Sequence, residues 1–267
     1  MPEPSPTALP APLGRRLLAE FLGTGLLVAV VVGSGIAAQR LSPEDTGLQL
    51  LQNSLTTMFG LGVLILAFGP VSGAHFNPAV SLVDWAVGRS SRTGLSGRDV
   101  IAYIVAQVGG GIGGALLANV MFGLAAAQIS KHVRGGSGLW VGELVATAGL
   151  IAVILVLART GRSSLSAAAV AAWIGAAYWF TSSTSFANPA VTIARMFSDT
   201  FAGIAPTSVP MFILFQLLGA AIGTGIALLL HPDTSTIADA VVTPRAPNVV
   251  ADSSDDLTAE PVERTSR

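Results

Sequence analysis

The stretch Ser-Thr-Ser-Phe-Ala-Asn-Pro-Ala-Val at residues 183–191 ends in the same tetrapeptide as Ser-Gly-Ala-His-Phe-Asn-Pro-Ala-Val at residues 72–80. Both copies of Asn-Pro-Ala-Val lie in chain that the surrounding sequence places inside a membrane. A single tetrapeptide is easily a coincidence. Two copies, at matching places in two hydropathically similar halves, indicate a channel built as an inverted repeat.

Long apolar stretches surround both copies. The 267-residue chain is 51% hydrophobic and 11% charged, whereas a soluble domain has roughly 25% charged residues, and its mean hydropathy is +0.67. Six stretches approach the ~20 residues that cross a bilayer core as a helix; they are residues 16–38, 48–69, 100–124, 138–158, 166–183 and 209–230.

These spans predict the domain organisation. We expect one channel domain at residues 15–232, with a first repeat at about 15–130 and a second at about 135–232. A disordered segment at 1–14 and a disordered acidic tail at 233–267 flank it, because both are polar or Pro-rich and lack periodicity.

The two halves match beyond the tetrapeptides. Glu20 and Glu143 lie in corresponding first spans, and Gln107 and Gln216 in corresponding third spans. The third spans also carry glycines four residues apart, which suit close helix crossing: Gly110, Gly114, Gly219 and Gly223. Because three spans per half is an odd number, the second half is inverted and the two motifs enter the membrane from opposite sides.

Each motif is predicted to open a half-helix that ends near mid-bilayer. Asparagine is a favoured N-cap, proline suits the first helical position, and alanine lets the two prolines approach. The neutral amides can then donate to a passing solute, while two positive helix N-termini repel cations. The predicted pore motifs are Asn77, Pro78 and Ala79 in the first copy and Asn188, Pro189 and Ala190 in the second.

Glu20 and Glu143 admit two interpretations. A carboxylate within a span is costly and usually faces the protein interior. It can belong to a proton relay, as in an ion-coupled transporter, or it can accept hydrogen bonds from irregular backbone in the motif loops. The second is favoured, because no Lys, Arg or His within a span continues a relay.

Several function classes lack sequence support. The chain has no cysteine, and its three histidines are scattered without metal-ligand spacing. No phosphate-binding loop or nucleophile elbow is present. We therefore expect no enzyme activity, no metal and no cofactor, and the net charge of -1 favours no nucleic-acid partner.

The chain resembles the aquaporin and aquaglyceroporin family over roughly residues 15–230. The residues that carry the resemblance are the first motif loop with His75, the segment Ala-Glu-Phe-Leu-Gly-Thr around Glu20, and the two glutamine-bearing spans. The resemblance implies an all-α membrane protein with six transmembrane helices and two re-entrant half-helices, in a right-handed aquaporin-type bundle. It also implies a pore in each protomer and a homotetramer.

The resemblance also assigns a selectivity constriction. One of its four positions, three residues after the second motif's asparagine, is usually arginine; here it is Val191. Counting along the chain assigns the other three positions to Phe59, Ala176 and Ser185, the first with a two-residue gap. Such a ring would be wider and less polar than a water filter.

Arg195 follows Val191 by one helical turn. It either replaces the missing arginine near the mouth or anchors the loop, for instance to Asp199. Residues 183–195 and 198–203 further resemble a bacterial subgroup associated with arsenic resistance, which implies passage of arsenite or methylated arsenic species.

Basic residues predict the orientation in the cell membrane. Seven lie in connections on one side, at positions 15, 16, 89, 92, 98, 159 and 162, and four on the other, at positions 40, 131, 134 and 195. This multi-pass chain should therefore have both termini in the cytoplasm.

The leading functional hypothesis is a passive channel for small neutral solutes larger than water, such as glycerol-like polyols and metalloid hydroxides, with water also passing. The alternatives are a water-selective aquaporin and, from another class, an ion-coupled secondary transporter using Glu20 and Glu143.

Overall fold

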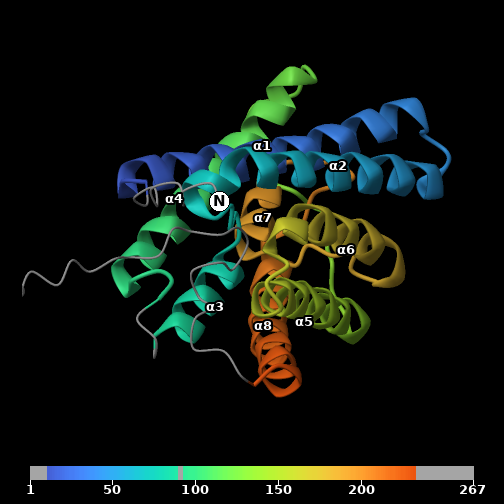
Figure 1. Ribbon diagram of the computed structural model, residues 1–267. Helices are drawn as coiled ribbons and strands as arrows, with labels where there is room; N and C mark the ends of the chain where they lie inside the picture. Colours follow the sequence, from blue (N-terminus) through green and yellow to red (C-terminus); the bar gives the residue numbers. More distant parts are fainter. Residues whose placement is uncertain (1–10, 90–92, 233–267) are drawn as a thin grey trace, which may run out of the picture.

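The computed structural model describes residues 11–89 and 93–232, and within them every regular element is helical (Figure 1). The α-helices are α1 (Leu13–Leu41), α2 (Thr46–Ser72), α3 (Pro78–Gly88), α4 (Gly97–Met121), α5 (Ser137–Arg159), α6 (Ser166–Phe180), α7 (Pro189–Ala194) and α8 (Val209–Leu230). Short 3₁₀ helices lie at Ser163–Leu165, Arg195–Phe197 and Pro206–Ser208.

Six of these helices are long and apolar enough to cross a membrane: α1, α2, α4, α5, α6 with the 3₁₀ turn before it, and α8 with the turn before it. The predicted six-span, all-α fold is confirmed, with boundaries that differ from the expected ones by a few residues. Helix α1 begins at Leu13, inside the segment 1–14 that was expected to be disordered. The predicted tail at 233–267 lies outside the described residues.

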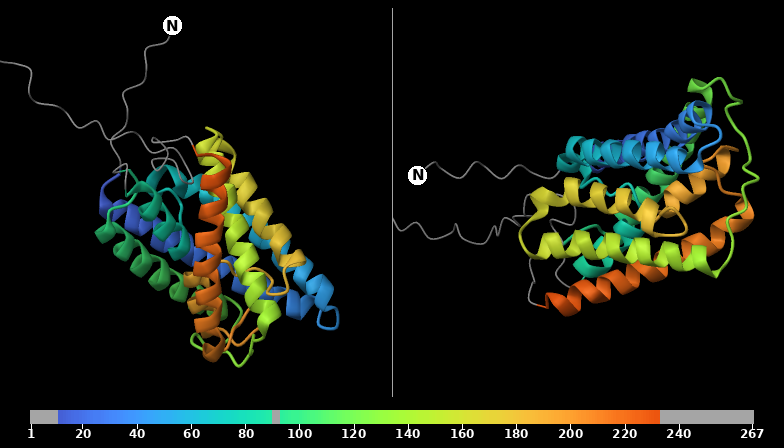
Figure 2. Two further views of the ribbon diagram at one scale, coloured as in Figure 1. Left: turned by 90° about the horizontal axis from the view of Figure 1, so that it is seen from below. Right: turned by 90° about the vertical axis from the view of Figure 1, so that its right-hand side faces the viewer.

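The long helices run side by side, and the two short ones, α3 and α7, lie among them. In the right-hand view of Figure 2 the connection from α4 to α5, in green, runs along one side of the bundle, and α8 ends on the other. We call the side where α1 begins and α8 ends the termini side, and the other the opposite side. In Figure 1, α7 lies between the α1–α2 pair and α5, α6 and α8.

The asparagines of the two motifs cap α3 and α7 as predicted. Asn77 Oδ1 accepts a hydrogen bond from the Ala79 amide at 2.9 Å. Asn188 Oδ1 accepts from the amides of Ala190 at 2.9 Å and Val191 at 3.3 Å. Both prolines occupy the first helical position, where the missing N–H has no intrahelical partner to lose. In each repeat, the Asn-Pro pair thus begins a helix in the middle of the bundle.

Small residues let the helices of each repeat cross closely. In the first repeat, a Cβ added to Gly110 or Gly114 would meet the backbone of α1, and the Gly114 Cβ would strike the Gly25 carbonyl oxygen. In the second repeat, a Cβ on Gly219 or Gly223 would meet the backbone of α5 in the same way. Because lipid offers little hydrophobic drive for helix association, such close packing stabilises membrane bundles.

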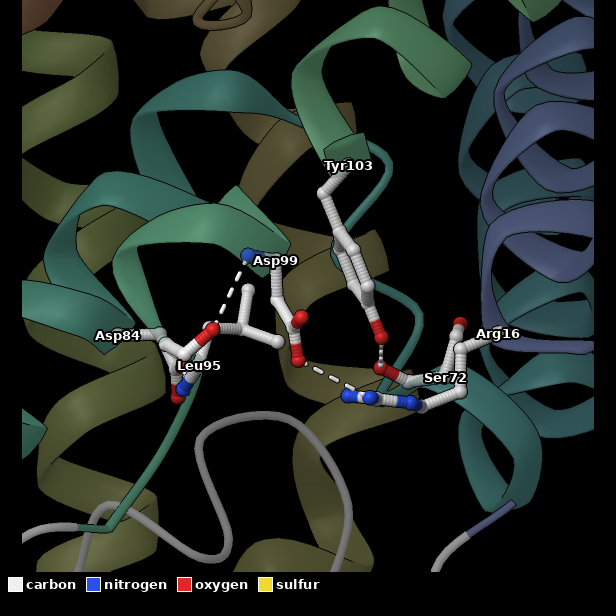
Figure 3. Close-up of polar contacts among 7 residues, drawn as sticks. Arg16, Ser72, Asp84, Leu95, Asp99 and Tyr103 are labelled. Carbon is white, nitrogen blue, oxygen red and sulfur yellow. Dashed lines mark hydrogen bonds and ion pairs between the residues drawn. The ribbon is translucent and has the colours of Figure 1, made fainter. Parts of the chain in front are cut away.

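Polar contacts join helices on the termini side (Figure 3). They link α1 to α4, α4 to the end of α2, and α3 to the segment before α4. The pairs are Arg16 Nη2 with Asp99 Oδ2 at 3.0 Å, Tyr103 Oη with the Ser72 carbonyl oxygen at 3.0 Å, and the Leu95 amide with Asp84 Oδ2 at 2.7 Å. The last of these contacts attaches the re-entrant helix α3 to the segment that leads into α4.

Substitution of Gly114 should test the close crossing. We expect Gly114→Ala to lower stability by about 1–3 kcal/mol, because the new methyl group overpacks against α1. Gly113→Ala is the matched control, since its Cβ would meet nothing within 4 Å. The measurement is the thermal unfolding midpoint of each purified variant in detergent. Equal midpoints for the two variants would contradict the packing argument.

Candidate pore and its constriction

The first motif loop is held by Glu20, which is fully buried. Its Oε1 accepts hydrogen bonds from Ser72 Oγ at 2.6 Å and the His75 amide at 3.0 Å. Its Oε2 accepts from the Phe76 amide at 2.7 Å and Gln107 Nε2 at 2.8 Å. Four donors therefore surround the carboxylate, and two of them are backbone groups of the irregular loop.

Glu143 does the same for the second motif loop. Its two oxygens accept from the amides of Phe186 at 2.8 Å and Ala187 at 2.9 Å, and Gln216 Nε2 also donates to it. Gln216 donates in turn to Thr192 Oγ1 on α7, as Gln107 does to Ser81 Oγ on α3. Of the two interpretations of these glutamates, the geometry matches the loop-holding one.

The motif asparagines tie the two loops together at the centre. Asn77 Nδ2 donates to the Ala187 carbonyl oxygen at 2.8 Å, and Asn188 Nδ2 donates to the Phe76 carbonyl oxygen at 2.7 Å. A side-chain amide carries two N–H donors. Each asparagine therefore keeps one N–H beyond the one that joins the loops.

A cavity passes both asparagines. Its volume is about 60 Å³. Its walls are mostly apolar and come from α1, α2, α5 and α6 together with the two motif loops. The polar lining residues are Thr57, His75, Asn77, Tyr178, Ser185, Asn188 and Arg195.

Two of the four residues expected at the constriction line this cavity, and two do not. Ser185 and Val191 are lining residues. Phe59 is wrong for this role, because its side chain is 65% exposed on the outside of α2. Ala176 is also wrong, because it lies on the exposed face of α6 and not in the lining.

Thr57 and Tyr178 occupy the wall where Phe59 and Ala176 were expected. Each lies two residues from the expected position, and their hydroxyl oxygens are 3.2 Å apart. Neither residue was predicted from the sequence to line the pore. Their polarity could have identified them in the sequence, because a polar side chain in an apolar span usually faces the protein interior.

Arg195 reaches the cavity from the end of α7. It is buried, its Nε donates to the Ala202 carbonyl oxygen, and its Cζ lies 3.4 Å from the centre of the Phe186 ring. Asp199, the suggested partner, instead accepts from the Lys131 amide at 2.8 Å. Arg195 thus anchors the loop through the Ala202 carbonyl oxygen and not through Asp199, and it also lines the cavity.

A second arginine, in the connection between α4 and α5, holds the segment that contains the partner of Arg195. Arg134 donates through Nε to the Gly203 carbonyl oxygen at 2.9 Å and through Nη2 to the Phe201 carbonyl oxygen at 3.0 Å. Its Cζ lies 5.2 Å from the Phe186 ring centre. Burial lowers the pKa of Arg134 to about 10, so the guanidinium stays charged at neutral pH.

No cluster of three or more candidate metal ligands occurs in the part of the chain that the structure describes. His75 packs against Tyr103, with ring centres 5.4 Å apart, and its Nδ1 lies 3.1 Å from Ser81 Oγ. His75 is also one of the residues that line the cavity.

Comparison with known proteins agrees with this architecture. The chain is 51% identical over 208 residues to the aquaglyceroporin AqpS of Rhizobium meliloti (strain 1021), covering 78% of this chain and 86% of that protein. It is 33% identical over 243 residues to aquaporin Z of Photorhabdus laumondii, covering 82% and 98%. The X-ray structure of the aquaglyceroporin from Plasmodium falciparum shares the fold, with a TM-score of 0.57, 21% identity and coverage of 84% and 97%.

A family model also matches most of the chain. Residues 10–185 match the model described as major intrinsic protein, and the match includes the first motif and the buried glutamates of both repeats. Members of this family are membrane channels and not enzymes. The chain therefore belongs to the major intrinsic protein family of aquaporin and aquaglyceroporin channels.

Proposed function

We propose that this protein is a passive channel for small neutral solutes larger than water, with water also passing. The observation that carries the proposal is the short aliphatic side chain of Val191 in the cavity wall, one turn beyond the cap of α7. No long or charged side chain occupies that position, which supports the passage of solutes wider than water.

The solutes that suit this wall are polyols such as glycerol and undissociated metalloid hydroxides, with arsenite and methylarsenate among them. All are compact, neutral at neutral pH or when protonated, and carry several hydroxyl groups. The relative named as an aquaglyceroporin supports the polyol class by similarity. The metalloid class rests on the residues at 183–195 and on the absence of arginine at position 191.

Two rival functions make different demands. A water-selective aquaporin needs a tight wall, which the short side chains of Val191 and Ser185 in the cavity lining do not favour. An ion-coupled transporter needs groups that change protonation during transport, but four donors already occupy the Glu20 carboxylate. The passive channel fits the observed contacts with fewer additional assumptions.

The assembly and orientation belong to the same proposal. We place four protomers in the membrane, each with its own pore. The termini side faces the cytoplasm, because the connections on that side carry the larger number of basic residues.

Reconstituted protein tests the proposed function. Full-length protein in liposomes should speed the swelling caused by inward gradients of glycerol, arsenite and methylarsenate. Flux should follow the gradient and should not change with an imposed membrane potential. Fast water flux with no solute flux would favour the water-selective rival. Accumulation against a gradient would favour the transporter.

Val191→Arg should close the channel to larger solutes while sparing water. The guanidinium fills the space beside Ser185 and adds a fixed charge. We expect glycerol flux to fall about tenfold or more, equivalent to ~1.4 kcal/mol in barrier height, and water flux to fall much less. The measurement is the ratio of the two permeabilities in liposomes. Val191→Met is the matched control for side-chain length without charge. An unchanged ratio in Val191→Arg would show that position 191 does not set the size limit.

Asn188→Asp should weaken the exclusion of cations. Aspartate still caps α7, but it places a negative charge where two helix N-termini meet. We expect measurable Na⁺ or proton conductance, which patch or flux recordings on liposomes can detect. Asn188→Ser keeps a neutral cap and serves as control. If both Asn188→Asp and Asn77→Asp conduct no more than the native protein, the barrier to cations lies elsewhere.

A further inference from the structure

The termini side of the bundle carries an excess of positive charge. Two carboxylates lie at that end of the described chain, Asp84 and Asp99, while Glu20 is enclosed by the first motif loop. Six arginines less two carboxylates leave a formal charge of +4 on this side. We call the six the arginine-rich face; they are Arg15, Arg16, Arg89, Arg98, Arg159 and Arg162.

Both carboxylates of this side already have partners inside the bundle. Asp84 is 2% exposed, and its Oδ2 accepts the Leu95 amide at 2.7 Å. Asp99 Oδ2 accepts from Arg16 Nη2 at 3.0 Å, which is the one ion pair among residues 11–89 and 93–232. The other five arginines of the face therefore have no carboxylate partner in the described chain.

Four of these arginines are exposed to solvent, at positions 15, 89, 98 and 162. The fifth, Arg159, is half-buried and donates through Nε to the His231 carbonyl oxygen at 2.8 Å. This bond holds the residue after α8 beside the end of α5. Residues 233–267 follow directly, so the chain beyond α8 starts next to the arginine-rich face.

The residues that follow have the opposite charge. Residues 233–267 lie outside the described residues, but their sequence contains seven acidic residues and three arginines, a formal charge of -4. This matches the +4 of the described termini side in size. The seven are Asp233, Asp239, Asp252, Asp255, Asp256, Glu260 and Glu263.

The acidic segment is long enough to reach every arginine of the face. Its 35 residues can span at most ~120 Å, whereas α1, with 29 residues, is only about 44 Å long. A segment tethered to its binding surface also meets it at a high effective concentration, which reaches millimolar values for short connections. Weak contacts therefore suffice to hold the segment there.

We propose that the acidic segment 233–267 binds the arginine-rich face of the channel. One exposed ion pair contributes little, but several unpaired guanidiniums face seven carboxylates, and guanidinium–carboxylate contacts are often bidentate. The proposal depends on the charges of the two surfaces and not on which solute passes. The rival occupant is the phosphate group of anionic lipids, which basic residues at a membrane surface also attract.

Disulfide cross-linking tests the contact, because the chain has no cysteine of its own. Ser164→Cys occupies an exposed position between α5 and α6, and Ser253→Cys lies in the acidic segment. Full-length protein with both changes is placed in phosphatidylcholine nanodiscs. The rate of disulfide formation under a mild oxidant is measured by mass spectrometry and corrected for the reactivity of each thiol towards a neutral alkylating reagent.

Salt should slow the cross-linking. We expect the rate to fall about fivefold or more between ~0.05 M and ~1 M NaCl, because the Debye length shortens to about 3 Å at the higher concentration. Neutralising the segment should have the same effect at low salt while leaving the bundle unchanged. The variant carries Asp233→Asn, Asp239→Asn, Glu260→Gln and Glu263→Gln, which bring the charge of the segment to zero and lie away from position 253.

Neutralising the face should also slow the cross-linking at low salt. Arg15→Gln, Arg89→Gln and Arg98→Gln together remove three exposed charges that lie far along the chain from position 164. The matched control is Lys131→Gln, an exposed cation on the opposite side, which should leave the rate unchanged. A rate that ignores salt and is equal in the native-charge protein and the neutralised-segment variant would overturn the proposal, whether or not the face variant folds.

Nanodiscs that contain phosphatidylglycerol separate the acidic segment from lipid as the occupant. If the segment occupies the face, the cross-linking rate at low salt should stay within about twofold of the rate in neutral lipid, since the tethered segment outcompetes single headgroups. A rate in anionic lipid as low as that of the neutralised-segment variant would assign the arginines to lipid phosphate and would overturn the proposal.

Discussion

The structure depends on providing hydrogen-bond partners for the irregular backbone in the middle of a membrane-spanning bundle. Non-helical chain is tolerated at that depth only where it is buried in protein or lines a wet cavity. Five non-glycine residues of the two motif loops have left-handed φ values: Ala74, Phe76, Thr184, Ser185 and Ala187. Glu20 and Glu143 accept the amides of these loops, and the two asparagines join them. Removing either carboxylate would leave several buried donors unpaired.

This constraint explains why polar residues match so closely between the repeats. In each repeat, one glutamate, one glutamine and one hydroxyl form a chain from a long helix to a half-helix: Glu20, Gln107 and Ser81 in the first, and Glu143, Gln216 and Thr192 in the second. A passive pore needs its backbone carbonyls and donors fixed. Carboxylates that stay fully hydrogen-bonded serve that purpose better than carboxylates that move protons.

The sequence predicted the elements whose signals are local. Apolar length identified the six spans, and Asn-Pro at a helix start identified α3 and α7. The predictions for Phe59 and Ala176 were wrong. An error of two residues along a helix moves a side chain to the opposite face, and counting along the chain cannot determine which residue of a helix faces the cavity. Arg134 was also missed as a member of the mouth, since its contacts to the segment 201–203 join distant parts of the chain.

In the proposed channel, the residue at position 191 and the arginine at position 195 would have separate tasks, which one arginine at position 191 would combine. Four residues along a helix correspond to about 6 Å, so the backbone of Arg195 lies about one turn from that of Val191, and both side chains line the cavity. Phe186 and the Ala202 carbonyl oxygen contact the guanidinium of Arg195, which also lines the cavity. In the proposed channel, Val191 would let bulkier neutral molecules pass, and the guanidinium of Arg195 would supply a positive charge that opposes cations.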